Sequence, residues 1–412
     1  MKPRADYDVI IIGGGPTGAT LACALAQADF QVALVEARDF PPELSNDYDL
    51  RIYAINRASE NILRQLGAWT HLSGPRILPY REMHVWEELG EIHFHCDDID
   101  AENLGHIIEN QTLESALNQC VASFSSIHWQ RPARIAHIDI QVSSAKVTLQ
   151  DGSSLQAPLV IGADGGQSKV RELLDIPCNI SDYNQLAIVG NIRTAESHQD
   201  TAWQRFLPDG PLAFLPLPEP NLLSIVWSVR TMQARKLLNM TDAAFCDALS
   251  QASEYCLGNV ESVSKRASFP LQRRHADHYV QPRAALIGDA VRSIHPLAGQ
   301  GMNLGLLDVA TLAETLIDAK YRGRDIGELL TLRRYERRRK GHNLLMLNMM
   351  DNLNRLFSNS IPPVKWLRNL GLNLTDLTAP AKRLFMSQAL GISGDRPTLV
   401  RSKTDVESAA KF

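Results

Sequence analysis

Clusters of glycine and acidic residues in this 412-residue chain have the spacing of nucleotide-binding turns. The first cluster, residues 13–18 (GGGPTG), directly follows the apolar run 7–12. In such a turn Gly13 allows a sharp exit from a strand, Gly15 lets the backbone approach a pyrophosphate, and Gly18 allows close packing of helix on strand. The helix that follows would face the phosphates with unpaired amide groups and the positive end of its dipole.

An acidic residue lies at the end of the second apolar run, the position where a nucleotide-binding βαβ unit requires it. A helical stretch at 19–28 and a second apolar run at 31–35 follow the glycines, and this run ends on Glu36. A carboxylate at that point binds ribose hydroxyls and repels the 2′-phosphate of NADP. These residues predict a βαβ unit for an ADP-containing cofactor, but by themselves they do not separate FAD from NAD.

Two later turns narrow the choice of cofactor. Residues 162–165 (GADG) place Asp164 after an apolar run, a pattern that is also typical of an ordinary strand-to-helix turn. Residues 286–290 (LIGDA) place Asp289 after another buried run, and the glycine-rich segment 299–305 then opens a helix. A carboxylate there suits ribityl hydroxyls, and a helix N-terminus stabilises the negative charge that grows at the flavin N1–C2=O edge on reduction. This third cluster favours FAD.

His295 and Pro296 lie between Asp289 and the glycine-rich segment. The histidine has two interpretations, a general base or, more commonly for a residue on a turn, a structural side chain. The sequence shows no Ser/His/Asp set, no metal-ligand cluster and no convincing carboxylate pair. This pattern agrees with a reaction whose difficult chemistry belongs to a cofactor.

The elements around these clusters predict an α/β fold with a discontinuous Rossmann-like FAD-binding domain, an inserted antiparallel-sheet substrate domain and a C-terminal helical segment. The insertion is indicated by short strand-like segments, punctuated by proline and glycine, that begin near residue 182. The expected FAD-binding parts are 1–75, 101–181 and 275–343; the expected substrate-domain parts are 76–100 and 182–274; C-terminal helices follow at 344–393 and a polar tail at 394–412.

Composition, charge and the lengths of the apolar runs argue against a disordered, fibrous, nucleic-acid-binding or membrane-spanning protein. Hydrophobic residues make up 44% and charged residues 21%, as in ordinary globular proteins. The formal net charge of −4 gives no reason to expect a nucleic-acid partner. No apolar run approaches the ~20 residues of a spanning helix, and the early strand leaves no room for a signal peptide. We therefore expect a cytoplasmic protein that at most rests on the surface of the inner membrane.

The three clusters, in this order and spacing, resemble the para-hydroxybenzoate-hydroxylase-like class of flavoprotein monooxygenases over most of the chain. Within that class the finer similarity is to the FAD-dependent hydroxylases of ubiquinone biosynthesis, and the nearest branch is the one that hydroxylates 2-octaprenylphenol in bacteria. The segments that carry this similarity are 104–110 (LGHIIEN), 213–217 (AFLPL), 295–305 (HPLAGQGMNLG) and 332–337 (LRRYER). Two departures, 165–168 (GGQS) for the commoner GANS and 291–293 (VRS) for AHT, bear on the exact substrate and not on the cofactor.

The resemblance implies FAD as cofactor and assigns a role to each cluster. The first cluster would hold the ADP half of FAD, Asp164 would serve FAD and a transient nicotinamide nucleotide, and Asp289 would hold the ribityl chain. Arg51 matches a segment near the flavin, with a surface ion pair as the alternative. The implied cofactor-binding residues are Gly13, Gly15, Thr17, Gly18, Glu36, Arg51, Asn110, Asp164, Asp289, Gly301, Met302 and Asn303, and His295 and Pro296 are candidates for the wall beside the flavin.

The implied reaction uses NADH or NADPH to reduce FAD, O2 to form a flavin C4a-hydroperoxide, and a polyprenylated phenol whose ring attacks the distal oxygen. Because a single dinucleotide fingerprint is visible, the nicotinamide nucleotide would dock transiently, or electrons would come from a partner. Alternatives on the same scaffold are hydroxylation at another ring position or of a soluble phenol, and a flavin-dependent reductase. A non-enzymatic binding protein like the prenyl-protein escort proteins is the remote alternative.

Two basic segments near the C-terminus leave alternatives open. Residues 361–374 place apolar residues near helical spacing with basic residues between them, which fits either a helix touching the inner membrane or a biosynthetic partner, or a helix packed on the FAD domain. The run 333–340 (RRYERRRK) is usually a solvated helix face, with anionic lipid or a neighbouring subunit as the alternative contact. The sequence leaves the oligomeric state open, a homo-oligomer included.

Overall fold

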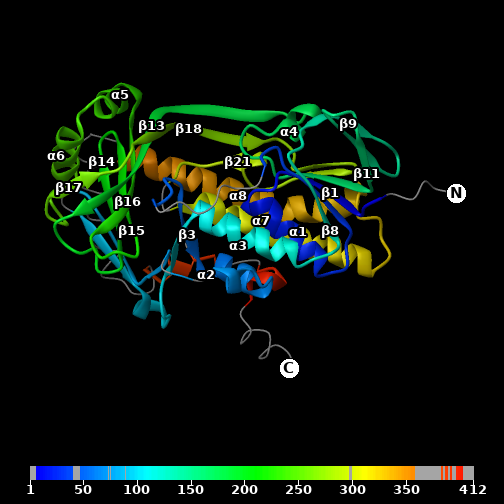
Figure 1. Ribbon diagram of the computed structural model, residues 1–412, viewed down its shortest axis with the longest axis horizontal. Helices are drawn as coiled ribbons and strands as arrows, with labels where there is room; N and C mark the ends of the chain where they lie inside the picture. The colour runs from blue at the N-terminus through cyan, green and yellow to red at the C-terminus, as the bar shows by residue number, and fades with distance from the viewer. Residues whose placement is uncertain are drawn as a thin grey trace.

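The structure is a computed structural model that describes residues 6–39, 47–72, 74, 76–88, 90–296, 299–357, 382–383, 386–387, 390–391 and 396–401. Two regions lie side by side in Figure 1, and the long strands β13 (Cys178–Thr194) and β18 (Ala267–Ala276) run along the top from one region to the other. The α/β fold class expected from the sequence is confirmed.

A six-stranded sheet forms the core of the first region. Its order is β19-β20-β12-β1-β2-β8, and every pair is parallel except β19 with β20. The strands come from three separate parts of the chain, which makes this region discontinuous as predicted. Their apolar side chains are almost all buried, as expected when both faces of a parallel sheet are covered. The bounds are β1 Val9–Ile12, β2 Val32–Val35, β8 Ile127–Gln130, β12 Leu159–Gly162, β19 Val280–Gln281 and β20 Ala284–Leu286.

Helices cover one face of this sheet, and a small antiparallel sheet covers the other. Helix α1 (Pro16–Ala26) contacts β1, β2 and β8, and it packs against α3 (Asn110–Ala122) and α7 (Gln300–Tyr321). Helix α8 (Leu329–Phe357) packs on α7. The sheet β11-β10-β9 contacts β1 and β12 from the opposite side; its strands are β9 Ile135–Ile140, β10 Ala145–Leu149 and β11 Ser154–Ala157. The short helix α4 (Lys169–Leu173) follows β12.

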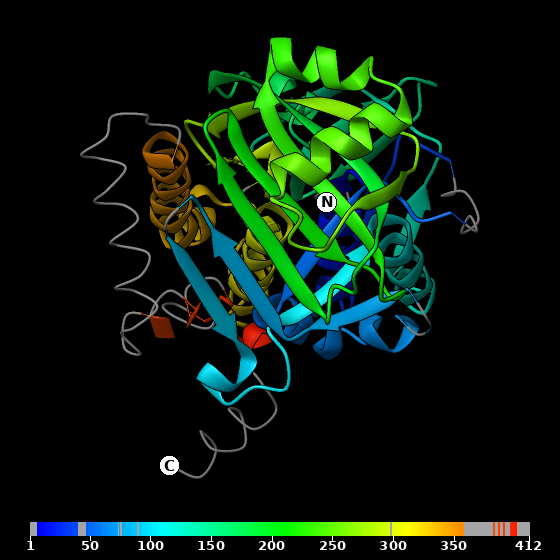
Figure 2. The ribbon, with the colours of Figure 1, turned by 90° about the vertical axis from the view of Figure 1, so that its left-hand side faces the viewer.

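A nine-stranded sheet forms the second region, with the order β21-β18-β13-β16-β15-β14-β5-β6 and with β17 paired to β13. It is antiparallel except for the pair β14 and β5. Helices α5 (Thr231–Leu238) and α6 (Asp242–Ala252) lie in front of it in Figure 2. Their apolar residues pack against this sheet in a second core, separate from the core of the first region. The remaining bounds are β5 Glu82–Trp86, β6 Glu91–His95, β14 Thr201–Leu207, β15 Gly210–Pro216, β16 Leu222–Arg230, β17 Val260–Val263 and β21 Arg292–Ser293.

A three-stranded sheet of order β3-β7-β4 joins the two regions. Strand β4 (Ile77–Tyr80) was expected among the substrate-domain strands, but it pairs with β7 (Gly105–Glu109), which pairs with β3 (Ile52–Asn56). Arg81 separates the two sheets along the chain: β4 before it belongs to the three-stranded sheet, and β5 and β6 after it belong to the nine-stranded sheet. Helix α2 (Arg57–Gln65) follows β3 and packs on α7.

The C-terminal part of the chain is described only in short pieces. Residues 396–401 include the 3₁₀ turn η5 (Thr398–Val400), which contacts α2 and α7, so this piece of the expected polar tail is packed. It is held because Val400 is buried and its carbonyl accepts a hydrogen bond from Asn61 Nδ2 at 3.0 Å. The expected surface helix at 361–374 lies outside the described residues. Among the helices that the structure describes, none is long and apolar enough to cross a membrane.

The basic run 333–340 lies in α8, and several of its side chains have partners within the protein. Arg334 and Arg338 pair with Asp318 and Glu314 of α7, and Lys340 Nζ donates to the carbonyl of Asp277. Arg339 is buried. Arg333, Arg334 and Arg337 are exposed, so α8 does present one solvated basic face, while the buried Arg339 lies on the side that packs against the protein.

Candidate functional site

A cavity of about 810 Å³ lies between the parallel sheet, the N-terminus of α7 and the nine-stranded sheet. Ten of the residues predicted for the site line it: Gly13, Gly15, Thr17, Glu36, Arg51, Asp164, Asp289, Pro296, Gly301 and Met302. The structure thus brings together residues that are nearly 300 positions apart in the chain. Gly18, Asn110, His295 and Asn303 are not part of the lining.

The glycine cluster 13–18 forms an open cradle at the N-terminus of α1. Gly13 has a φ of +107°, and a side chain there would overlap the carbonyl group of Ala163. A methyl group at Gly18 would overlap the carbonyl oxygen of Gly13, so Gly18 is needed for packing although it does not face the cavity. At Gly15 nothing lies within 4 Å of an added methyl group, which leaves space for a ligand.

Glu36 stabilises this cradle from the end of β2. Its Oε2 accepts a hydrogen bond from the Gly14 amide at 2.7 Å, and its Oε1 accepts from the Arg38 amide at 2.9 Å. A ribose contact, as predicted, would add to these bonds and not replace them, since each carboxylate oxygen has further lone pairs.

Asp164 is engaged mainly with its own turn. Its Oδ2 accepts hydrogen bonds from the amides of Lys169 at 2.7 Å and Val170 at 3.0 Å, and its Oδ1 accepts from the Ser168 hydroxyl. These bonds cap α4 and hold the turn at the cavity wall. Arg171 then donates to the carbonyl of Ala290 at 2.8 Å, which ties the second glycine–acid cluster to the third.

Asp289 differs from the other acids of the site. Within the described ranges no protein group hydrogen-bonds to its carboxylate, although it lies in the cavity wall. Burial raises the pKa of Asp289, while the positive charges of Arg292 and Arg51 act in the opposite direction. A carboxylate that faces a cavity without a protein partner is suited to accept hydrogen bonds from a ligand with hydroxyl groups.

Arg51 and the start of α7 complete the middle of the cavity. The guanidinium of Arg51 lies 5.4 Å from the centroid of the Tyr53 ring, and no ion pair to it occurs in the part of the chain that is described. Helix α7 begins after Gly299, whose φ is +62°, and at Gly301 an added methyl group would meet no atom within 4 Å. The first amide groups of α7 therefore have room to face a bound group.

Two side chains predicted as cofactor contacts have partners within the protein. Asn303 donates from Nδ2 to the carbonyl of Ala54 at 2.9 Å and accepts from the Asn56 amide at 3.1 Å, so it fastens α7 to β3. Asn110 Oδ1 accepts from the hydroxyl of Tyr53 at 2.9 Å. Tyr53, which was not predicted from the sequence as a site residue, lines the cavity. The Asn110 side chain lies behind Tyr53 and is not itself part of the lining.

His295 is buried behind the cavity wall and is not part of the lining, which favours its structural interpretation. Its ring is buried, its Nε2 lies 3.2 Å from Gln185 Oε1, and it packs edge-on against Tyr183. Burial lowers the pKa of His295 to about 4. The neighbouring Pro296 does line the cavity.

A buried ionic network supports the turn that carries Asp289. Asp308 of α7, which is fully buried, lies 2.8 Å from Arg339 Nε and 3.3 Å from Arg292 Nη2, and it accepts from the Gly288 amide at 3.2 Å. Asn343 adds a hydrogen bond to the same carboxylate. No spacing rule relates these positions, so the partners of Asp308 could not be predicted from the sequence.

We expect Asp289→Ala to weaken FAD binding about 10- to 100-fold, because a hydrogen bond to a charged group contributes about 1.5–3 kcal/mol. The dissociation constant is measured by titrating the apoprotein with FAD and following flavin fluorescence. Asp151→Ala, at an exposed turn between β10 and β11, is the matched control and should bind FAD normally. Wild-type affinity in Asp289→Ala would contradict the assignment.

The residues of this cavity fit FAD. The cradle at Gly15 is open, the Asp289 carboxylate lacks a protein partner, and two helix N-termini, those of α1 and α7, border the same space. Such an arrangement suits a pyrophosphate at one helix, ribityl hydroxyls in the middle and an electron-rich ring edge at the other helix.

Comparison with known proteins agrees with this geometry. A family model described as FAD binding domain matches residues 6–348. Among solved structures, p-nitrophenol 4-monooxygenase from Pseudomonas putida DLL-E4 has a TM-score of 0.75 at 17% identity, covering 93% of this chain and 98% of its own. A complex of aklavinone-11 hydroxylase with FAD and aklavinone has a TM-score of 0.67 at 19% identity, covering 84% and 68%. Fold and site thus define a flavoprotein with an FAD-binding domain.

Similar sequences narrow the class. The 3-demethoxyubiquinol 3-hydroxylase of Escherichia coli (strain K12) is 36% identical over 387 residues, covering 93% of this chain and 98% of its own. Ubiquinone hydroxylase UbiL of Rhodospirillum rubrum is 38% identical, covering 96% and 92%. The human mitochondrial ubiquinone biosynthesis monooxygenase COQ6 is 35% identical, covering 93% and 92%. The chain belongs to the family of FAD-dependent hydroxylases of ubiquinone biosynthesis.

Proposed function

We propose that this enzyme hydroxylates the ring of a polyprenylated phenol in ubiquinone biosynthesis. The observation that carries the proposal is the distribution of charge in the cavity. Among its described lining residues, every acid, lysine and arginine comes from outside the nine-stranded sheet. The lining side chains from that sheet are uncharged and mostly apolar; they include Met83, Val189, Ala202, Leu215, Val226 and Phe269.

An apolar wall opposite the cofactor residues has two consequences. It accepts a prenylated ring without burying unpaired charge, which would be costly. It also excludes water from the reacting centre and so strengthens the electrostatic interactions there. Activation of O2 and acceptance of electrons from NADH or NADPH, the proposed reductants, belong to the FAD when it is bound. The chain's own part is to position the ring and to stabilise negative charge with the amides of α7.

The ring position has two candidates. The sequence resemblance to the branch that acts on 2-octaprenylphenol favours the first ring hydroxylation of the pathway. The similarity to a 3-demethoxyubiquinol 3-hydroxylase supports ring position 3 as the second candidate. A polyprenylated substrate resides in lipid, so we infer a cytoplasmic enzyme that works at the inner-membrane surface. Segment 361–374 is one candidate for the contact with lipid or a partner, and packing on the FAD domain is its alternative. A homo-oligomer remains a further proposal.

Complementation tests the substrate. The chain is expressed in bacterial cells that lack each ubiquinone hydroxylase in turn, and the quinone intermediates are analysed by mass spectrometry. Restored ubiquinone in one strain identifies the ring position. In vitro, addition of the matching prenylated phenol should accelerate NAD(P)H oxidation and yield one hydroxylated ring per O2 consumed. Oxidation of NAD(P)H without ring oxidation for all candidate phenols, together with failure in every strain, would overturn the proposal.

A further inference from the structure

Two histidines and a glutamate meet on the outer face of the β5–β6 hairpin, away from the cavity. His84 of β5 stands directly opposite His93 of β6 in the antiparallel register, and Glu91 lies two residues before His93. Because alternate residues of a strand share a face, the three side chains project to the same side. Met83, on the opposite face of β5, lines the cavity.

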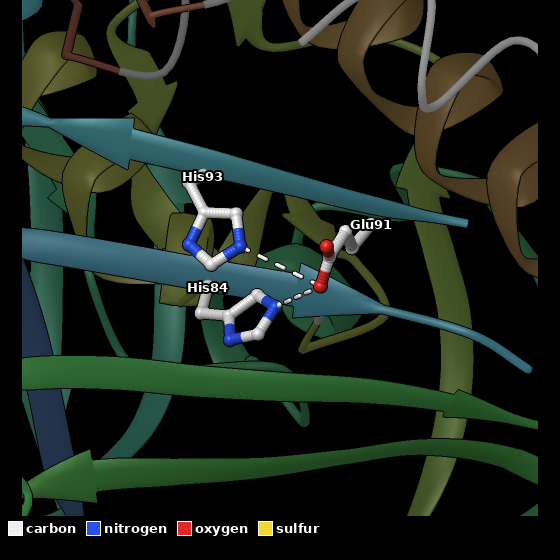
Figure 3. A group of neighbouring side chains, drawn as sticks. All are labelled: His84, Glu91 and His93. Carbon is white, nitrogen blue, oxygen red and sulfur yellow. Dashed lines mark hydrogen bonds and ion pairs between the residues drawn. The ribbon is translucent and has the colours of Figure 1, made fainter. Parts of the chain in front are cut away.

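The ligand atoms of these three residues converge. Glu91 Oε2 lies 3.2 Å from His84 Nε2 and 3.6 Å from His93 Nε2, and all three atoms lie within 4.8 Å of one another. Figure 3 shows both imidazoles directed at the Glu91 carboxylate from the two neighbouring strands. Ligand atoms around a tetrahedral Zn²⁺ at bond lengths of ~2.0–2.1 Å are roughly 3.3 Å apart. The two distances from Glu91 Oε2, 3.2 and 3.6 Å, are already close to this separation.

The surroundings have further features of a metal site. Glu82 Oε1 lies 3.3 Å from Nδ1 of His93, the nitrogen turned away from Glu91. Metal-bound histidines commonly donate this second N–H to a carboxylate, which orients the ring and raises its basicity. Trp86 and Trp203 flank His84 at 5.2 and 5.1 Å between ring centroids and limit its movement.

The charge of the hairpin also favours a cation. Residues 82–95, which form the two strands and their turn, contain four glutamates and three histidines, with no lysine or arginine. The neighbouring group of His95, Cys96 and Asp97 is a weaker candidate, because His95 Nδ1 already accepts a hydrogen bond from the Asp97 amide.

We propose that His84, Glu91 and His93 bind a divalent metal ion of the Zn²⁺ class, with Glu82 orienting His93 and water completing the coordination. Imidazole nitrogen with one carboxylate suits Zn²⁺ and excludes Mg²⁺ as a preferred ion. The ion would join β6, the edge strand of the nine-stranded sheet, to β5, whose other face forms part of the cavity wall. The sequence did not reveal this cluster, since Glu-x-His plus a histidine across a hairpin has no characteristic spacing.

Calorimetric titration of the untagged, FAD-loaded protein with ZnCl2, after treatment with EDTA and dialysis, tests the site. We expect one Zn²⁺ per chain and a higher melting temperature with Zn²⁺ than with EDTA. His84→Ala and His93→Ala should each weaken binding at least about 100-fold, and Glu82→Gln about 10- to 100-fold. Glu88→Gln is the matched control, because it removes one exposed charge from the same hairpin outside the cluster.

The flavin spectrum of each variant shows whether it has folded, since the cluster lies outside the FAD residues. His137→Ala, at an exposed position of β9, controls for the general loss of an imidazole. Three results would each overturn the proposal: no saturable Zn²⁺ binding, equal binding of Mg²⁺ and Zn²⁺, or folded His84→Ala and His93→Ala variants with wild-type affinity. The second result would mean that the acidic surface attracts dications without a built site.

Discussion

Asp308→Asn should lower the free energy of unfolding of the apoprotein by about 3–5 kcal/mol, the usual effect of breaking a buried ion pair by removing one partner. The carboxylate of Asp308 is fully buried between Arg292 and Arg339, which are almost fully buried themselves. With an amide in its place, two guanidinium groups lose their counter-charge in a medium that solvates them poorly. Urea denaturation of the apoprotein, followed by circular dichroism, measures the change without a contribution from FAD binding.

Asp318→Asn is the matched control. Asp318 lies on the same helix and pairs with Arg322 and Arg334, but these partners are substantially exposed. An exposed pair contributes about 0–1 kcal/mol, so this variant should stay close to the wild type. If both variants lose the same small amount, the network around Asp308 is not a major source of stability.

Gly18→Ala and Gly15→Ala should separate the two roles of the glycine cradle. A methyl group at Gly18 overlaps the carbonyl oxygen of Gly13, so helix α1 must move away from β1. Overpacking of this kind costs about 1–3 kcal/mol or more, and we expect the upper end because the obstacle is backbone. Gly15 has open space, so Gly15→Ala should leave the apoprotein as stable as the wild type.

FAD binding should respond differently from stability. The methyl group of Gly15→Ala occupies space in the cavity where the pyrophosphate is proposed, so we expect at least a 10-fold weaker FAD affinity, about 1.4 kcal/mol. Urea denaturation of the apoproteins and FAD titrations measure the two effects separately. Gly15→Ala with normal FAD affinity would show that the pyrophosphate lies elsewhere, and Gly18→Ala with normal stability would show that α1 relaxes freely.

Local patterns in the sequence were sufficient to predict the cavity residues proposed to bind the cofactor. The strand, the glycines at 13–18 and Glu36 are close in the chain, and their roles depend on backbone geometry that nearby residues set. Each glycine–acid cluster also contains its own turn, so Asp164 and Asp289 could be assigned to the cavity before their distance in space was known. The inserted antiparallel sheet was predictable for the same reason, because strands and turns leave short-range patterns.

Contacts between distant residues were decided only by the tertiary structure. Asn303 and Asn110 carry polar groups that the sequence assigned to FAD, but folding supplies them with partners on β3. His295 is buried against Gln185 of β13, 110 residues away. The apolar wall of the cavity and the cluster of His84, Glu91 and His93 likewise arise from strand pairing.

The basic run 333–340 shows why local turns could be predicted from the sequence and contacts between distant side chains could not. Its charges suggested a solvated face, yet Arg339 is buried because Asp308 on another helix compensates its charge. Backbone turns are governed by neighbours in the chain and can be inferred from them. Whether a polar side chain faces water, a ligand or a buried partner depends on what folding brings beside it, and no local pattern contains that information.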